Sequence, residues 1–106
     1  MDKNELYPIF LKVNQLQVLI VGGGNVGLEK LSFLLKSSPN ANVSLVAPFI
    51  KEEIRTLAKK HPTVTLIEDA YEHEYLDQKH IVIAATDDQI VNLNIFLEAK
   101  RRNLLV

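Results

Sequence analysis

Hydrophobic residues along this chain change their spacing repeatedly, and each change predicts the boundary of a secondary-structure element. Residues 18–21 are a short apolar run rich in β-branched side chains, which is typical of a buried strand. Glycines occupy residues 22–24, and leucines then recur at helical spacing until two serines and a proline at residues 37–39, which predict the end of a helix. The pattern therefore opens with a strand, a tight turn and a helix.

The same alternation continues along the rest of the chain. Further runs typical of buried strands lie at residues 43–47, 63–67 and 81–85, and residues 104–106 begin another. Residues 68–80 are polar and follow no clear period. The remaining apolar residues recur at helical spacing and predict two more helices, one with the stripe Ile50, Ile54, Leu57 and Ala58, and one that runs to about Arg102 with the stripe Ile90, Leu93 and Leu97.

Strands that alternate with helices of about 10 to 15 residues indicate right-handed crossovers between parallel strands. We therefore predict an α/β fold, a Rossmann-type doubly wound parallel sheet with helices on both faces. Residues 8–13 alternate weakly and are interpreted as an edge strand or an arm packed on the sheet. No repeat or linker divides residues 1–106, so we expect a single domain. An apolar strand that stops at Val106 is an unusual end for a natural protein, which suggests a piece of a longer one.

Composition and charge argue against several functional classes. Twelve Lys and Arg against thirteen Asp and Glu give a net charge of −1, so no overall field favours nucleic acid or anionic lipid. The chain has no Cys, which excludes disulfides and thiolate chemistry and fits a reducing compartment, so we expect a cytoplasmic protein. The apolar runs are far shorter than the ~18 residues of a membrane span, and the polar start is unlike a signal peptide.

Gly22, Gly24 and Gly27 match the GxGxxG spacing between the first predicted strand and helix. In that context the glycines are typical of a dinucleotide site. Gly22 permits the tight turn, Gly24 lets a pyrophosphate approach the backbone, and Gly27 lets the helix pack on the sheet. The phosphates would lie at the helix N-terminus, where free amide groups and the helix dipole favour anions. A glycine-rich turn without a ligand is the alternative.

An acidic residue usually follows about 20 residues later, at the end of the second strand, and binds the ribose hydroxyls. None is present there, and Glu52 and Glu53 fall inside the next predicted helix, where they are more simply first-turn acids. The choice between NAD and NADP therefore stays open at this point. Ribose contacts could come from the backbone at Ala47 and Pro48, with Phe49 near the adenine.

Thr86, Asp87 and Asp88 follow the fourth predicted strand, at the sheet edge where open α/β folds bind ligands. Thr86 is the ligand candidate, because a small hydroxyl residue leaves room for a ribose or nicotinamide. Asp88 is equally well explained as the N-cap of the last helix.

Other polar residues suggest no further chemistry. His73 lies in an acidic stretch without a second His at ligand spacing, so we expect a solvated loop and no metal site. His61 and His80 are interpreted as surface residues. The cations at residues 100–102 fall in the last turn of a predicted helix, where the dipole favours them without any nucleic acid. No residue is assigned as catalytic.

Taken together, four segments resemble the N-terminal domain of siroheme synthases, which is the precorrin-2 dehydrogenase family. Some members of this family are also sirohydrochlorin ferrochelatases. The segments are YPIFL at 7–11, VLIVGGGNVG at 18–27, VAP at 46–48 and IAATDD at 83–88. The absent ribose acid and the AATDD segment both differ from ordinary Rossmann dehydrogenases.

The resemblance implies an NAD-dependent oxidation of precorrin-2, a tetrapyrrole, to sirohydrochlorin on the way to siroheme. It also implies cofactor contacts at Gly24, Asn25, Val26, Pro48 and Phe49, in addition to Gly22 and Thr86 from the spacing above. Many members have Ala where this chain has Gly27.

In the family, a catalytic aspartate and a helical dimerisation region follow the fifth strand. We therefore expect a chain truncated before the catalytic region, inactive alone, whose parent is a homodimer. A nucleotide-sensing Rossmann module without catalysis is the alternative, although such modules usually keep the acid after the second strand.

Overall fold

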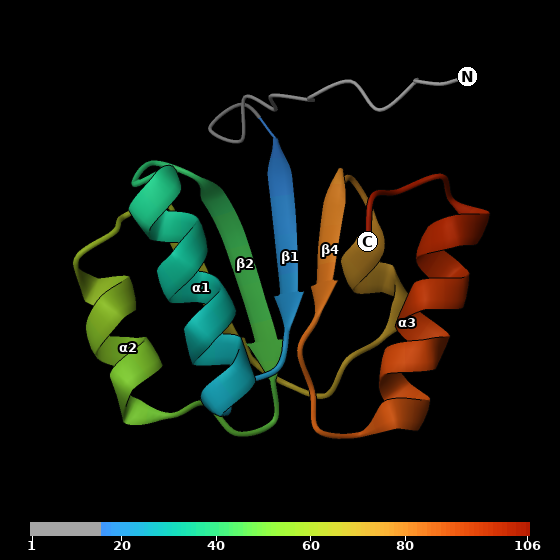
Figure 1. Cartoon of the computed structure of the whole chain (residues 1–106), viewed down its shortest axis with the longest axis horizontal. Coiled ribbons are helices and arrows are strands. Elements are labelled where there is room, and N and C mark those ends of the chain that lie inside the picture. The colour runs from blue at the N-terminus through green and yellow to red at the C-terminus, as the bar shows by residue number, and fades with distance from the viewer. Residues whose placement is uncertain (1–15) are drawn as a thin grey trace, which may run out of the picture.

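The computed structural model describes residues 16–106, so the edge strand or arm predicted at residues 8–13 lies outside the described residues. The regular elements alternate between strand and helix along the chain, as the sequence pattern predicts (Figure 1). In chain order they are β1 (Gln17–Val21), α1 (Asn25–Ser37), β2 (Asn42–Ala47), α2 (Glu52–Lys59), β3 (Val64–Glu68), the 3₁₀ helix η2 (His73–Leu76), β4 (Ile81–Ala84) and α3 (Gln89–Arg101).

The strands form one parallel sheet in the order β3-β2-β1-β4. Val18 of β1 pairs with Val43 on one side and with Ile81 on the other, so the chain reverses its direction of winding at β1. The carboxyl ends of β1, β2 and β4 consequently meet at one edge. An open α/β sheet binds ligands at such a switch point.

Two apolar clusters cover the two faces of the sheet. Val18 and Ile20 of β1 pack with the α1 and α2 side chains on one face, whereas Leu19 and Val21 pack with η2 and α3 on the other. This alternation follows from the two-residue period of a strand. The prediction of a doubly wound sheet with helices on both faces is confirmed.

The apolar face predicted for the last helix is wrong. Ile90, Leu93 and Leu97 are 72%, 54% and 53% exposed, whereas Ile95 and Ala99 are completely buried against the sheet. Helix α3 carries apolar residues on two sides, so spacing alone does not decide which side packs. Ile95 and Ala99 belong to the apolar cluster on this face of the sheet, so packing selects the buried side of the helix.

Two smaller differences concern segment boundaries. The apolar stripe predicted a helix from Ile50. The helix α2 begins two residues later, at Glu52, with Lys51 as its N-cap. The polar stretch at residues 68–80 contains the last residue of β3 and all of η2, and its Leu76 is only 2% exposed. A single helical turn is too short to show a period.

The apolar residues near residue 105 continue the sheet. Leu105 forms a parallel bridge with Ile81, and the Val82 N–H donates to the Leu105 carbonyl at 2.9 Å. Leu105 thus lies on the outer side of β4, where the fifth strand was predicted, but as an isolated bridge and not as a strand. Over residues 16–106, the structure contains no helix with the length and apolar character of a membrane span.

Candidate functional site

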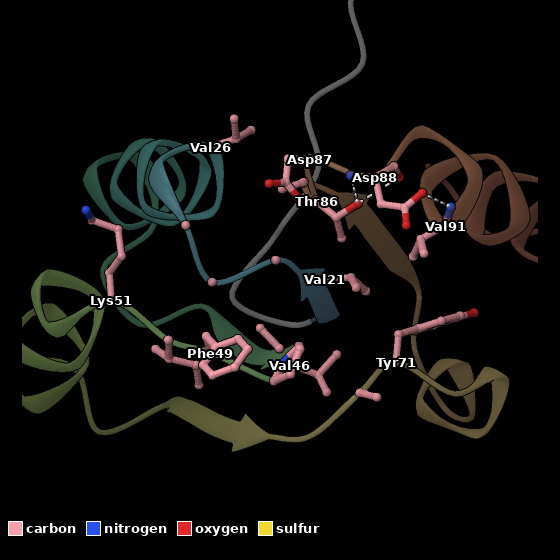
Figure 2. Close-up of a pocket in the computed structure, with 18 of the residues that line it drawn as sticks. Val21, Val26, Val46, Phe49, Lys51, Tyr71, Thr86, Asp87, Asp88 and Val91 are labelled. Atoms are coloured by element: carbon pink, nitrogen blue, oxygen red, sulfur yellow. Dashed lines mark hydrogen bonds between the residues drawn. The ribbon is translucent and has the colours of Figure 1, made fainter.

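A cleft of about 1060 Å³ opens at the carboxyl edge of the sheet, close to the upper limit of about 1,000 Å³ for small-molecule sites. Figure 2 shows Val46 and Phe49 on one side of the glycine turn and Thr86, Asp87 and Asp88 on the other. All the cofactor residues predicted from the sequence line this cleft, namely Gly22, Gly24, Asn25, Val26, Pro48, Phe49 and Thr86. The structure thus brings them together, and their contacts with a cofactor stay a prediction.

Gly22 and Gly27 are packed directly against backbone atoms in this chain. Gly22 has a φ of +138°, and a Cβ there would lie 2.2 Å from the Ala85 carbonyl oxygen. A Cβ on Gly27 would lie 2.2 Å from the Gly22 carbonyl oxygen. Real side chains do not approach a backbone so closely, so these two glycines allow strand β4 and helix α1 to close on the turn.

Gly23, which the sequence analysis left without a role, is also required by packing. A Cβ on Gly23 would lie 2.0 Å from the Phe49 carbonyl oxygen, and the Lys51 N–H donates to the Gly23 carbonyl at 2.9 Å. The turn after β1 and the turn after β2 are therefore packed directly against each other. The GxGxxG spacing does not include this position. The run of three consecutive glycines was the sequence signal that could have indicated its packing role.

Gly24 differs from its neighbours. A Cβ there would meet no atom within 4 Å, and its φ of −99° is accessible to other residues. It is the N-cap of α1, yet no side chain caps this helix and its first turn has no acidic residue. The fold does not require a glycine here, so the open space and the free amide groups at the helix start suit a phosphate.

The end of β2 has no carboxylate facing the cleft, as the sequence indicates. Pro48 is exposed, and Phe49 is 85% exposed. Glu52 and Glu53 lie in the first turn of α2, which confirms their interpretation as first-turn acids. An exposed aromatic ring beside a cleft offers a flat apolar face to a planar ligand.

The turn after β4 is held by side-chain hydrogen bonds. Asp88 caps α3, since its Oδ1 accepts from the Ile90 N–H at 2.9 Å and from the Val91 N–H at 3.2 Å. This confirms the capping interpretation of Asp88. Asn92 binds Thr86, because its Nδ2 donates to the Thr86 carbonyl at 3.0 Å and its Oδ1 accepts from the Thr86 hydroxyl at 2.6 Å. Asn92 was missed by the sequence analysis because no motif marks it.

Tyr71 and His73, from the segment between β3 and β4, also line the cleft. The Tyr71 hydroxyl lies 2.8 Å from the His73 Nδ1. Burial, followed by the negative charge of Glu98, raises the pKa of Tyr71 above 10. The described residues contain no cluster of three His, Cys, Asp or Glu side chains that could hold a metal.

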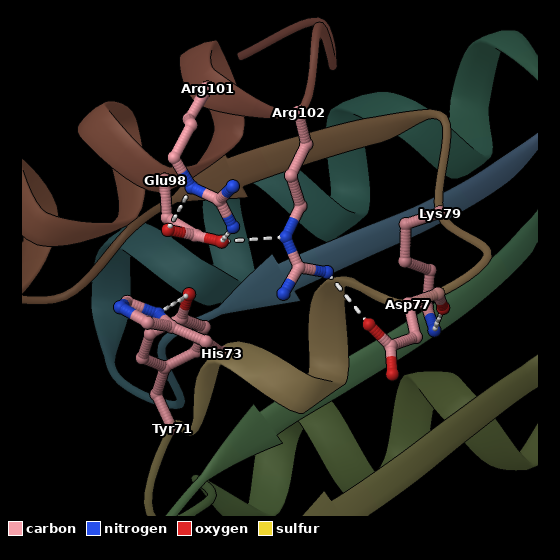
Figure 3. A network of polar contacts seen from close by, with 7 residues as sticks. All are labelled: Tyr71, His73, Asp77, Lys79, Glu98, Arg101 and Arg102. Carbon is pink, nitrogen blue, oxygen red and sulfur yellow. Dashed lines mark hydrogen bonds and ion pairs between the residues drawn. The ribbon is translucent and has the colours of Figure 1, made fainter.

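Two of the basic residues at the end of α3, Arg101 and Arg102, are paired within the domain (Figure 3). Hydrogen bonds from Arg101 and Arg102 lower the pKa of Glu98 to about 2. Arg102 also donates to Asp77 at 2.7 Å. Arg102 thus joins the end of α3 to the residue after η2, whereas Arg101 pairs with Glu98 within α3, which is consistent with a structural role for both arginines.

Residues 9–106 match the sequence model of a family of NAD(P)-binding domains. The chain belongs to this NAD(P)-binding family. The resemblance seen in the motifs is confirmed by its relatives. A siroheme synthase of Pseudoalteromonas atlantica is 38% identical over 102 residues, covering 96% of this chain and 21% of the relative. A siroheme synthase of Pseudoalteromonas translucida is 41% identical over 99 residues, covering 93% of this chain and 20% of the relative.

A solved structure in the same group, SirC, a precorrin-2 dehydrogenase, superposes with a TM-score of 0.75 at 27% identity. The match covers 94% of this chain and 48% of SirC. The chain therefore spans about a fifth of the length of the siroheme synthases and about half of SirC.

Proposed function

We propose that this chain is the NAD-binding domain of a precorrin-2 dehydrogenase, which oxidises precorrin-2 to sirohydrochlorin in siroheme biosynthesis. The observation that carries the proposal is the open space at Gly24, beside a helix start without a capping side chain. Gly22, Gly23 and Gly27 are explained by packing, so the one glycine that the fold does not need stands where a pyrophosphate would bind. The names of the siroheme synthases and of SirC support the choice of reaction.

The residues around the cleft fit the two halves of a dinucleotide. The amides at Gly24, Asn25 and Val26 would hold the pyrophosphate, and the segment at Pro48 and Phe49 would hold the adenosine half. When bound, the nicotinamide would accept a hydride from the tetrapyrrole. The domain's own residues would bind and orient the cofactor at the sheet edge.

NAD is proposed over NADP. A 2′-phosphate is usually bound by an Arg near the end of the second strand. Residues 47–50 contain no cation, and Lys51 is the nearest one in the sequence.

The rest of the reaction is proposed to depend on further parts of the parent protein. No described residue is assigned as catalytic, and Asp87 and Asp88 are the acids at the carboxyl end of β4. We propose that residues 1–106 are the cofactor domain of a cytoplasmic homodimer, and that ferrochelation is a further activity of the full-length parent. This chain alone should produce no measurable NADH from precorrin-2, whereas the parent extended beyond Val106 should.

The cofactor site is tested by titrating NADH into the Gly24→Val variant in a calorimeter. The valine side chain would fill the pyrophosphate space, so binding should weaken by at least about tenfold, or ~1.4 kcal/mol. Its melting temperature should stay close to that of the wild type, because the side chain enters open space. Glu29→Val adds the same side chain to an exposed position of α1 outside the cleft, and it should bind NADH normally. A folded Gly24→Val protein with unchanged affinity would show that the turn is not the site.

A further inference from the structure

The backbone amides of the turn after β4 can be accounted for one by one. The Ala85 N–H donates to the Val21 carbonyl at 2.8 Å. The Thr86 N–H donates to the Asn92 Oδ1 at 3.3 Å, and the Asp88 N–H donates to the Thr86 Oγ1 at 3.1 Å. Within residues 16–106, the Asp87 N–H has no hydrogen-bond acceptor. Asp87 is exposed, so its amide is the one in residues 85–88 that a ligand can reach without displacing a hydrogen bond within the protein.

The Thr86 side chain is committed to the protein. Its hydroxyl has one proton, which points to the Asn92 Oδ1 at 2.6 Å or to the Asp88 carbonyl at 3.0 Å, and its oxygen already accepts from the Asp88 N–H. The hydroxyl therefore has no second proton to donate to a ribose. Thr86 shapes the turn, and the group that the turn offers to a ligand is the neighbouring amide.

Asn92 is the centre of this arrangement. Its side-chain amide bonds to both the N–H and the carbonyl of Thr86, as a neighbouring strand would, and it also accepts from the Thr86 hydroxyl. Asn92 is the fourth residue of α3, whose N-cap Asp88 belongs to the same segment. The segment after β4 and the start of α3 are thus bonded to each other through both Asp88 and Asn92. Figure 2 shows Thr86, Asp87 and Asp88 of this segment beside the glycine turn.

We propose that Asn92 is a positioning residue for the cofactor: it holds Thr86 so that the Asp87 amide is presented to the half of the dinucleotide that lies beyond the pyrophosphate. The inference rests on the proposed function, because it assumes that a dinucleotide occupies the cleft. A cofactor fragment confined to the Phe49 side would not need this amide. Asn92 would therefore matter for NADH and matter little for AMP.

The test compares the affinities of NADH and AMP for Asn92→Ala, measured by calorimetry with the melting temperature recorded for each variant. NADH should bind about tenfold more weakly, the size expected for one hydrogen bond, and AMP should change by less than about twofold. Gln89→Ala, an exposed position at the start of α3 outside the cleft, should change neither affinity. A purely structural role would lower the melting temperature and leave the NADH to AMP ratio unchanged.

A second pair of variants keeps the test informative if Asn92→Ala does not fold. Thr86→Ser retains the hydroxyl and should bind NADH more tightly than Thr86→Val, which keeps the shape, loses the hydroxyl and should reproduce the selective loss. In the wild type, the Asp87 amide resonance should shift when NADH is added. Equal weakening of AMP and NADH, or unchanged NADH affinity in the folded variants, would overturn the role of Asn92. A wild type that binds no NADH would instead refute the proposed function.

Discussion

The turns after β1 and β4 line the same cleft and are built in opposite ways. The turn after β1 is shaped by missing side chains, since backbone atoms of Phe49 and Ala85 occupy the places where Cβ atoms of Gly23 and Gly22 would be. The turn after β4 is shaped by added side chains, since Thr86, Asp88 and Asn92 bond to backbone groups that the sheet leaves unpaired. The turn after β1 is fixed by steric exclusion. The turn after β4 depends on hydrogen bonds, which are lost when a single polar side-chain group is replaced by a methyl group.

The largest effect on stability should come from adding a Cβ atom to the glycine turn after β1. Gly22→Ala should lower the free energy of unfolding by about 3 kcal/mol, because the new Cβ must displace the Ala85 carbonyl and the φ of +138° is strained for alanine. Gly24→Ala should lower it by less than about 0.5 kcal/mol. Urea unfolding followed by circular dichroism measures both. Similar losses would mean that Gly24 also serves packing, and the distinction between the glycines would disappear.

A smaller effect, on the choice between NAD and NADP, is expected at Lys51. A substitution there removes the side-chain charge and keeps the backbone N–H. The backbone N–H holds Gly23 and is retained in Lys51→Ala, so the fold of the turn should be unaffected. NAD should bind the wild type at least as tightly as NADP, and the substitution should change the ratio by no more than about fivefold, the range of one exposed charge pair. Lys59→Ala, at the far end of α2, is the control. Markedly tighter NADP binding that disappears in Lys51→Ala would reverse the proposed preference.

The smallest effect concerns acid stability on the α3 side of the cleft. The pKa of Glu98 is lowered from 4.5 to about 2 by its arginine partners, so the folded state favours the charged carboxylate. Its contribution is fully present above pH 4.5 and is lost as the pH falls towards 2. Glu98→Gln should therefore show a flatter melting temperature between these pH values than the wild type, with Glu29→Gln as an exposed control. Parallel pH profiles for Glu98→Gln and the wild type would contradict the shift.

The same contrast explains how much of the molecule could be predicted from its sequence. The sheet, the order of the elements and the glycine turn follow from local patterns, because a strand period or a glycine spacing is visible within a few residues. Gly22 and Gly24 were predicted for this reason, whereas Asn25 and Val26 were predicted from the family resemblance. Gly23 was overlooked because its partner, the Phe49 carbonyl, lies on a different turn.

Features fixed by distant partners could not be predicted. The buried face of α3 was assigned to Ile90, Leu93 and Leu97 from their helical spacing, whereas Ile95 and Ala99 are the side chains that pack in the apolar cluster on the sheet. Leu76 was missed because a single 3₁₀ turn carries the buried side chain. In both places, tertiary packing decided what local periodicity left ambiguous.

The strand order also has a consequence for how the domain assembles. Val18 pairs with Val43 after one helical crossover, whereas its other partner, Ile81, arrives only after α2, β3 and η2 have been passed. Closing the longer loop costs more chain entropy, so we expect β1, β2 and β3 to associate before β4 docks. Native-state hydrogen exchange should then find the amides of β4 less protected than those of β1 and β2. The side of the cleft at Ala85 and Thr86 forms only when β4 docks. NADH would therefore bind only the complete sheet and would slow the dissociation of β4 from it.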